Sequence, residues 1–474
     1  MRAVAVASSM AWLARGGQRD GAARGELAGL RSGWYGCLGR WADALFELTD
    51  AVLCADGPVT SLPRLSPEPV CRRGHGSGYA ALAGGHVDAG GLADLLAGHR
   101  PAAWPLVFAV DATTWPRCAA QASPGRGLYY HPSRQTNGKP VVAGWCYQMV
   151  SQLNFSRDSW TWPADVRRID PREDAAAVTV AQVRGVAARL GAGGQAPLFV
   201  FDAGSSYDPA ALSHQLAGER VQLLVRLRKN RVFFGDPPPR APHANGRPRR
   251  RGALFDCKDP ASWGAPGAQL VTADPAYGMV TVRAWAGLHP RLTRRSRGRG
   301  RWASAAGPAP IVRGWVIRVE VTSLPKPGGQ ASTTLWLWWS GPDHLPPRLD
   351  LCWRSYLHRF DIEHAIRFAK TTLGWVTPAL RTPEQAGRQA AIITCAYAQL
   401  VLARPLAADH RLPWERPRDP GRLTPGRVRR DFPRLRPALP PVAKPPKPHG
   451  TGPGRPKGHP AHRAKRHPVI KKAA

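Results

Sequence analysis

Two short apolar runs, each ending in an aspartate, constrain the fold of this chain most strongly. The runs WPLVFAVD at residues 104–111 and PLFVFD at residues 197–202 are rich in strand-forming residues and have the length of buried strands. Apolar periodicity further predicts strands over 140–153 and 221–227, and helices over 172–190 and 209–216. Alternating strands and helices indicate an α/β domain. An aspartate after a strand is by itself more typical of a turn or helix cap, so Asp111 and Asp202 need further support.

The stretch YLHRFDIEHAIRFAK, from Tyr356 to Lys370, is the second informative feature. It lies in a helix predicted over residues 348–372. At 100° per residue, Arg359, Lys370 and Glu363 fall about 60°, 40° and 20° from Tyr356 around the helix. One face would then carry a carboxylate, two cations and a phenol. The alternative is an ordinary amphipathic helix whose charged residues are solvated.

The charge balance indicates a polyanionic partner. The chain of 474 residues has 67 Lys and Arg against 32 Asp and Glu, a net charge of +35. A field of this sign favours nucleic acid as the partner. The eight cysteines include no CxxC pair, which argues against a zinc site or a disulfide framework. No apolar run reaches membrane-spanning length and the N-terminus is a poor secretory signal, so we expect a cytoplasmic protein without membrane association.

The gaps of two, three and six residues between Tyr356, Arg359, Glu363 and Lys370 give the chain its resemblance to a known family. They resemble the YREK signature of bacterial insertion-sequence DDE transposases. In that family the first aspartate lies on the first strand of an RNase H-like core. The second follows the fourth strand, and the glutamate lies on a helix after a β insertion. The order of Asp111, Asp202 and Glu363 in this sequence is the same.

The resemblance implies a catalytic and metal-binding set made of Asp111, Asp202 and Glu363. Phosphodiester cleavage needs neutralisation of charge on the phosphoryl group and an activated water, which two divalent ions can supply. Mg²⁺ prefers carboxylate oxygens and keeps several waters, so three acids from separate elements suffice. We therefore expect two Mg²⁺ (or Mn²⁺) ions as cofactors.

The same resemblance implies that three of the signature residues contact DNA. Arg359 would hold a phosphate, Lys370 would act as a point charge, and Tyr356 would donate a hydrogen bond or stack on a base. Arg367 falls within about 20° of Tyr356 on the helical wheel, and we add it as a further DNA contact.

The predicted fold class is α/β, with an RNase H-like mixed sheet core. We expect a disordered N-terminus over 1–24 and a helical region over 25–103, followed by a DDE catalytic domain over 104–403. A β-rich subdomain is expected as an insertion at about 230–347, and a Pro-rich basic tail over 404–474. That tail has 19 Lys and Arg against four acids, a composition typical of a disordered segment.

Local signals predict three further helices. Apolar residues from Leu27 to Val52 recur in steps of three and four, which predicts one amphipathic helix ending near residues 56–57. A second helix is expected around 86–99. This region could bind DNA ends or could be a helical pad packed on the core. Thr382, Pro383 and Gln385 form a capping-box pattern that predicts a helix to about Ala403.

The predicted function is that of a DDE transposase, which cleaves a strand at the ends of an insertion sequence and transfers the freed 3′-hydroxyl. Its partners would be double-stranded DNA with terminal inverted repeats and a target DNA, bound by a homodimer. Two alternatives remain open: an RNase H-like DNA nuclease or resolvase without strand transfer, and an inactive transposase relic that only binds DNA.

Overall fold

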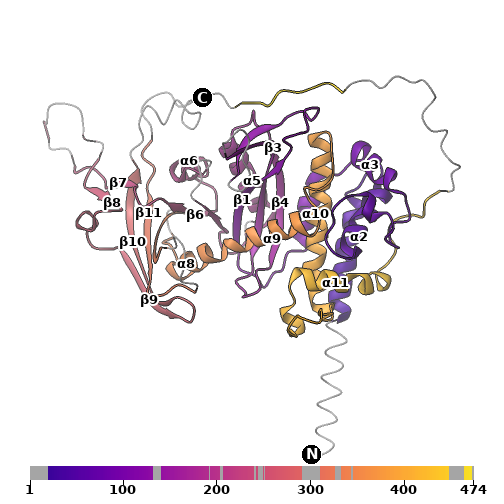
Figure 1. Ribbon diagram of the computed structural model, residues 1–474. Coiled ribbons are helices and arrows are strands. Elements are labelled where there is room, and N and C mark those ends of the chain that lie inside the picture. Colours follow the sequence, from indigo (N-terminus) through magenta and orange to yellow (C-terminus); the bar gives the residue numbers. More distant parts are fainter. Residues whose placement is uncertain are drawn as a thin grey trace, which may run out of the picture. The chain divides into compact units, whose positions relative to one another are not determined.

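The computed structural model describes residues 20–131, 140–191, 193–202, 207–239, 242–243, 249, 251–290, 310–325, 332–342, 345–447 and 464–471 (Figure 1). These residues form two compact units. Unit 1 comprises Met1–Ala103, Ala112–Arg172 and Asp361–Ala474, and unit 2 comprises Trp104–Asp111 and Glu173–Phe360. The division does not follow the predicted domains, because both units draw on residues inside 104–403.

Unit 2 is built on parallel strands that the apolar runs predict. The first half of β1 (Val107–Pro116) pairs in parallel with β5 (Leu198–Phe201), which pairs in parallel with β6 (Gln222–Leu227). All four residues of β5 are buried, as expected for a strand covered on both faces. Helix α5 (Ala175–Arg189) precedes β5, and helix α6 (Pro209–Gln215) connects β5 with β6. The predicted strands and helices of this region are therefore confirmed, as is the mixed α/β class.

The β-rich insertion expected at about 230–347 follows β6, and its described residues contain strands. They are β7 (Val232–Phe234), β8 (Leu254–Asp256), β9 (Ala268–Asp274), β10 (Gly278–Pro290), β11 (Gly314–Val321) and β12 (Thr334–Ser340). β12 pairs antiparallel with β6, and β11 and β10 follow outward in the strand order. The strands of the insertion thus extend the sheet of unit 2. Sequence alternation predicts strands but cannot show which strands pair.

In unit 1, the long strand β3 (Val141–Leu153) is the central strand. It pairs antiparallel with β2 (Gly127–Tyr130) and with β4 (Thr161–Ile169). Twelve of the thirteen residues of β3 are buried. The strand over 140–153 was predicted, whereas β4 was not, because its charged residues interrupt the alternation on which such predictions rest.

The N-terminal helical region departs from the sequence prediction in two ways. Residues 20–36 are already helical, so the predicted disorder over 1–24 is wrong for residues 20–24, and residues 1–19 lie outside the described part. The single helix predicted over 27–52 is interrupted before α2 (Ala42–Cys54). There the backbone pairs with a distant segment: the Gly39 amide donates to the His86 carbonyl at 3.1 Å, and the Asp88 amide donates to the Cys37 carbonyl at 2.9 Å. Helical periodicity carries no information about such a long-range pairing.

Three shorter elements follow α2, namely η1 (Pro63–Leu65), α3 (His75–Gly84) and α4 (Ala89–Gly98). Asp88 caps α4 by accepting a hydrogen bond from the Gly91 amide. α4 confirms the helix expected around residues 86–99.

The N-terminal helices pack against helices from the other end of the chain. Arg31 and Asp50 form a buried ion pair at 2.6 Å, and Arg31 also donates to Gln399 of α10 (Pro383–Ala403) at 2.6 Å. α10 begins with the predicted capping box of Thr382 and Gln385. In Figure 1, α10 lies beside α2 and α11.

The prediction of a disordered tail over 404–474 is wrong for its first part. Residues 404–438 include α11 (Pro425–Leu435) and three short 3₁₀ turns, η3 (Arg404–Leu406), η4 (Pro420–Arg422) and η5 (Arg436–Ala438). Val428 and Phe432 of α11 are fully buried, and Arg429 donates to the backbone carbonyls of Val52 and Gly57. Composition predicts disorder for the segment. A helix can nevertheless fold there when a few apolar residues on one of its faces are buried against the rest of unit 1. Residues 448–463 and 472–474 lie outside the described part.

The end of the described chain returns to the strands of unit 1. The Ile470 amide donates to the Arg126 carbonyl at 2.8 Å, which places Ile470 beside Gly127 at the start of β2. All eight cysteines carry free thiols. In the described part of the chain, no helix combines the length and the apolar character needed to cross a membrane.

Candidate active site

Strand register places Asp111 and Asp202 at equivalent positions of two neighbouring strands. Val110 of β1 is the partner of Phe201 of β5 in the parallel pair, and each aspartate is the next residue. Neighbouring strands lie about 4.8 Å apart, so the two carboxylates start from adjacent backbone positions. Asp202 follows β5 as predicted, whereas Asp111 lies inside β1, which continues to Pro116. Unit 2 therefore brings both predicted aspartates together.

Two residues of the signature hold the carboxylate of Asp202. The Tyr356 hydroxyl donates to Oδ1 of Asp202 at 3.2 Å, and the Arg359 guanidinium lies 3.4 Å from Oδ2. Tyr356 and Arg359 are only 3% and 1% exposed, while the Asp202 side chain is 38% exposed. Asp202 thus has a fixed, buried side and an open side that faces solvent.

The environment keeps Tyr356 protonated. Burial, followed by the negative charge of Asp202, raises the pKa of Tyr356 to about 12. The phenol is therefore neutral at physiological pH and can donate its proton to the carboxylate.

Arg226 is a part of this site that the sequence prediction missed. It lies on β6, 3.5 Å from Oδ1 of Asp202, and its guanidinium stands over the Tyr356 ring at 5.9 Å. Its side chain is 45% exposed. An arginine inside the otherwise apolar strand over 221–227 was the available signal, since strands buried on both faces rarely carry a charge.

The signature region is two helices and not the single helix predicted over 348–372. α8 (Leu349–His358) and α9 (Phe360–Thr371) meet at Arg359, whose amide bonds to the Tyr356 carbonyl at 3.3 Å, three residues back. This tighter turn interrupts the regular helical spacing on which the shared face of the signature was predicted. The predicted helix end at residue 372 is confirmed to within one residue, because α9 ends at Thr371 and Gly374, with φ +73°, follows it.

The remaining signature residues lie on α9 in unit 1. Glu363 is half-buried in the first turn, and Arg367 is exposed. Lys370 donates to the Thr114 carbonyl of β1 at 2.9 Å. Of the seven predicted site residues, unit 2 contains Asp111, Asp202, Tyr356 and Arg359, and unit 1 contains Glu363, Arg367 and Lys370.

The donor atoms of unit 2 suit a hard divalent cation. Carboxylate oxygens are the ligands that Mg²⁺ and Mn²⁺ prefer. The contacts of Asp202 with Tyr356, Arg359 and Arg226 measure 3.2–3.5 Å, longer than tight charge-assisted hydrogen bonds of about 2.7–2.9 Å. Within the described residues, no three His, Cys, Asp or Glu side chains are placed together to hold a metal ion. The three-acid cluster that includes Glu363 stays a prediction.

The site therefore consists of two aspartates on adjacent parallel strands of a mixed α/β fold, next to two arginines and a neutral tyrosine. The family model of the DDE superfamily endonucleases matches residues 34–291, more than half of the chain, so this protein belongs to that family. The matched region contains Asp111 and Asp202 and ends before Tyr356. A comparison with curated proteins found no match.

Proposed function

We propose that this DDE superfamily endonuclease is the transposase of an insertion sequence, which cleaves DNA at the ends of its element and joins the freed 3′-hydroxyl to a target. The proposal rests on Asp202, which lies beside Asp111 and is held by Tyr356 and Arg359, two residues with the spacing of the YREK signature. Its RNase H-like core and its insertion-sequence origin are part of the proposal.

Asp111, Asp202 and Glu363 would hold two Mg²⁺ or Mn²⁺ ions. When bound, such ions neutralise charge on the phosphoryl group and lower the pKa of water. Tyr356 and Arg359 would set the orientation of the Asp202 carboxylate, because both are buried against it. Because Tyr356 and Arg359 lie on the buried side of Asp202, their predicted contacts with DNA would require both side chains to become accessible. Arg226, half exposed next to Asp202, would compensate negative charge where the phosphate lies.

The substrate would be double-stranded DNA with terminal inverted repeats, with a separate target DNA. A net charge of +35 supports a polyanionic partner. Arg367 and Lys370 on α9 are the proposed phosphate contacts outside unit 2. We further propose a homodimer on DNA, since two ends must be cut, and action in the cytoplasm.

A cleavage and joining assay tests this function. DNA that carries the inverted repeats flanking the coding region is incubated with the purified full chain, Mg²⁺ and a target plasmid. Wild-type protein should give nicked ends and joined products, and Asp202→Asn should give neither. Cleavage without joined product would overturn the transposase proposal in favour of a nuclease or resolvase. Binding without any cleavage in Mg²⁺ or Mn²⁺ would indicate an inactive relic.

A further inference from the structure

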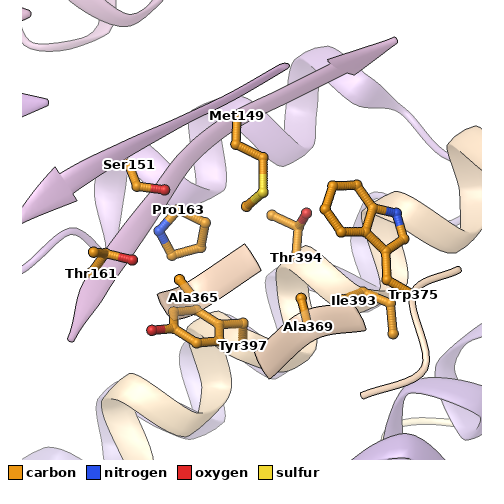
Figure 2. Close-up of a pocket in the computed structure, with 10 residues that line it drawn as sticks. All are labelled: Met149, Ser151, Thr161, Pro163, Ala365, Ala369, Trp375, Ile393, Thr394 and Tyr397. Atoms are coloured by element: carbon orange, nitrogen blue, oxygen red, sulfur yellow. The ribbon is translucent and has the colours of Figure 1, made fainter. Parts of the chain in front are cut away.

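A small buried cavity lies in unit 1 between the sheet and the helices α9 and α10 (Figure 2). Strands β3 and β4 supply Ser151 and Thr161 to its wall, α9 supplies Ala365 and Ala369, and α10 supplies Tyr397. The cavity measures about 10 Å³. A single water needs roughly 10–15 Å³ of such space together with two to four polar partners. The cavity therefore has room for one water molecule and for no larger ligand.

Three hydroxyl groups border this cavity without a hydrogen-bond partner, namely those of Ser151, Thr161 and Tyr397. Their side chains are at most 4% exposed. Among the other buried polar side chains around the cavity, the Thr394 hydroxyl donates to the Ala390 carbonyl of its own helix at 2.8 Å, whereas the Trp375 indole N–H also has no hydrogen-bond partner. An unsatisfied buried hydroxyl is costly, and three around one cavity indicate a common partner.

The geometry brings these three hydroxyls to one side of the cavity. Ser151 pairs with Pro163 and Thr161 pairs with Leu153, so Ser151 and Thr161 are diagonal neighbours on the same face of the β3–β4 pair. Tyr397 reaches toward them from α10, and in Figure 2 all three hydroxyls lie on the same side of the cavity. Hydrogen-bonding contacts with the side chain and the backbone of Thr161 lower the pKa of Tyr397, although the two hydroxyls do not reach full hydrogen-bond geometry. Burial has the larger effect and raises the pKa of Tyr397 to about 12, so the phenol keeps its proton and can donate it.

We propose that this cavity is a specific site for one structural water, which bridges the hydroxyls of Ser151, Thr161 and Tyr397. The water would join β3, β4 and α10 at the point where Ala365 and Ala369 of α9 close the cavity. The site is distinct from the aspartate pair and does not depend on the proposed function. The bound water would then be part of the surface against which α9 packs, and α9 is the helix that carries Glu363 and Lys370.

The effect of Ser151→Ala on Tm depends on whether the water is bound. If the water is present, Ser151→Ala removes one of its partners and should lower the Tm of the full chain by about 2–4 °C. If the hydroxyl of Ser151 has no partner, the same change removes an unsatisfied polar group and leaves Tm unchanged or raises it. An unchanged or raised Tm would overturn the proposal. Ser151 is the most informative position. A direct hydrogen bond between Thr161 and Tyr397 would not involve Ser151, so it could not explain a lower Tm after loss of the Ser151 hydroxyl.

Coupling between sites gives a second test. Ser151→Ala and Thr161→Val would act on the same water, so the double variant should lower Tm by less than the sum of the two single changes. Ser151→Ala combined with Thr394→Val is the matched control, because Thr394 lines the same cavity but bonds within α10. Additive effects for the first pair would contradict a shared water. A high-resolution crystal structure provides the direct check: density for a water within hydrogen-bond distance of all three hydroxyls is expected, and its absence would refute the site.

Discussion

Tyr356 donates a hydrogen bond to Asp202 across 154 residues of sequence, at a distance of 3.2 Å. The contact joins the start of the signature to one of the two aspartates of unit 2. Because the phenol is buried and the carboxylate is partly open, the tyrosine fixes one oxygen of Asp202 while solvent reaches the other side. A carboxylate held in this way is oriented before any cation arrives, which favours binding because less side-chain motion is lost.

Asp111→Asn should abolish DNA cleavage. The change removes a negative charge and a metal-binding oxygen, and a loss of several kcal/mol of transition-state stabilisation corresponds to a rate at least about a thousandfold lower. Single-turnover cleavage of labelled DNA measures the rate. Asp208→Asn is the matched control: Asp208 caps α6 through the Ala211 amide at 2.9 Å, and asparagine caps equally well. Equal loss of cleavage in both variants would contradict a special role for Asp111.

Arg359→Ala should destabilise the protein more than Arg226→Ala. Arg359 is 1% exposed, contacts Asp202, and stacks on Phe360 with its guanidinium 4.5 Å from the ring centre. Its loss should cost about 1–3 kcal/mol, because buried partners lose a charged donor. Arg226 is 45% exposed, so its pairing should contribute less than about 1 kcal/mol. Urea unfolding of the two variants gives the comparison. Equal destabilisation would show that burial of Arg359 has no energetic consequence.

Phe432→Ala should destabilise unit 1 by about 3–5 kcal/mol, because the side chain of this α11 residue is fully buried. Trp414→Ala is the control, since Trp414 is 79% exposed and its loss should change stability by less than about 0.5 kcal/mol. Thermal unfolding and limited proteolysis both report the difference. A disordered segment over 404–447 would instead be cleaved rapidly in the wild type, and Phe432→Ala would have no effect.

Acid should weaken the contact between Glu415 and Arg430. Hydrogen bonds from Arg430 and from the Leu412 amide lower the pKa of Glu415 from 4.5 to about 2. A depressed folded-state pKa contributes stability above the unfolded pKa, and this stability is lost as the pH falls from about 4.5 to about 2. The Tm difference between wild type and Glu415→Gln should therefore shrink over this interval. A difference that stays constant from pH 6 to pH 2 would show that the carboxylate charge is not involved.

Arg367→Ala should weaken DNA binding for all sequences alike and lower the slope of log K against log salt by about 1. Arg367 is exposed on α9 and would contact phosphate, not bases. Binding titrations at several salt concentrations measure the slope. Arg367→Lys keeps the charge and should keep the slope. If Arg367→Ala leaves the slope at the wild-type value, Arg367 does not contact DNA.

Local signals in the sequence predict much of this fold because they act over a few residues. The apolar runs before Asp111 and Asp202 predict β1 and β5, and the capping box at Thr382 predicts the start of α10. These features depend on strand propensity and on hydrogen bonds within one turn, which a short window of sequence contains.

Features that depend on distant partners could not be predicted in the same way. The helix break near Gly39 follows from pairing with His86, and the folding of α11 follows from burial of Val428 and Phe432 in unit 1. Arg226 is part of the site because β6 pairs with β5, and the sequence does not show that pairing. Residue types and their spacing predict the aspartates and the signature. The residues that lie beside them in space can be identified only from the three-dimensional structure.

The pairing of β12 with β6 limits which insertions and deletions the inserted segment can tolerate. Loops between the strands of the inserted segment could vary in length without disturbing the sheet, because they connect strands that remain paired. Deletion of the whole segment would leave one side of β6 with unsatisfied amides and carbonyls, and β6 is the strand next to β5, which Asp202 directly follows. The insertion should therefore persist in any shortened, working version of this enzyme.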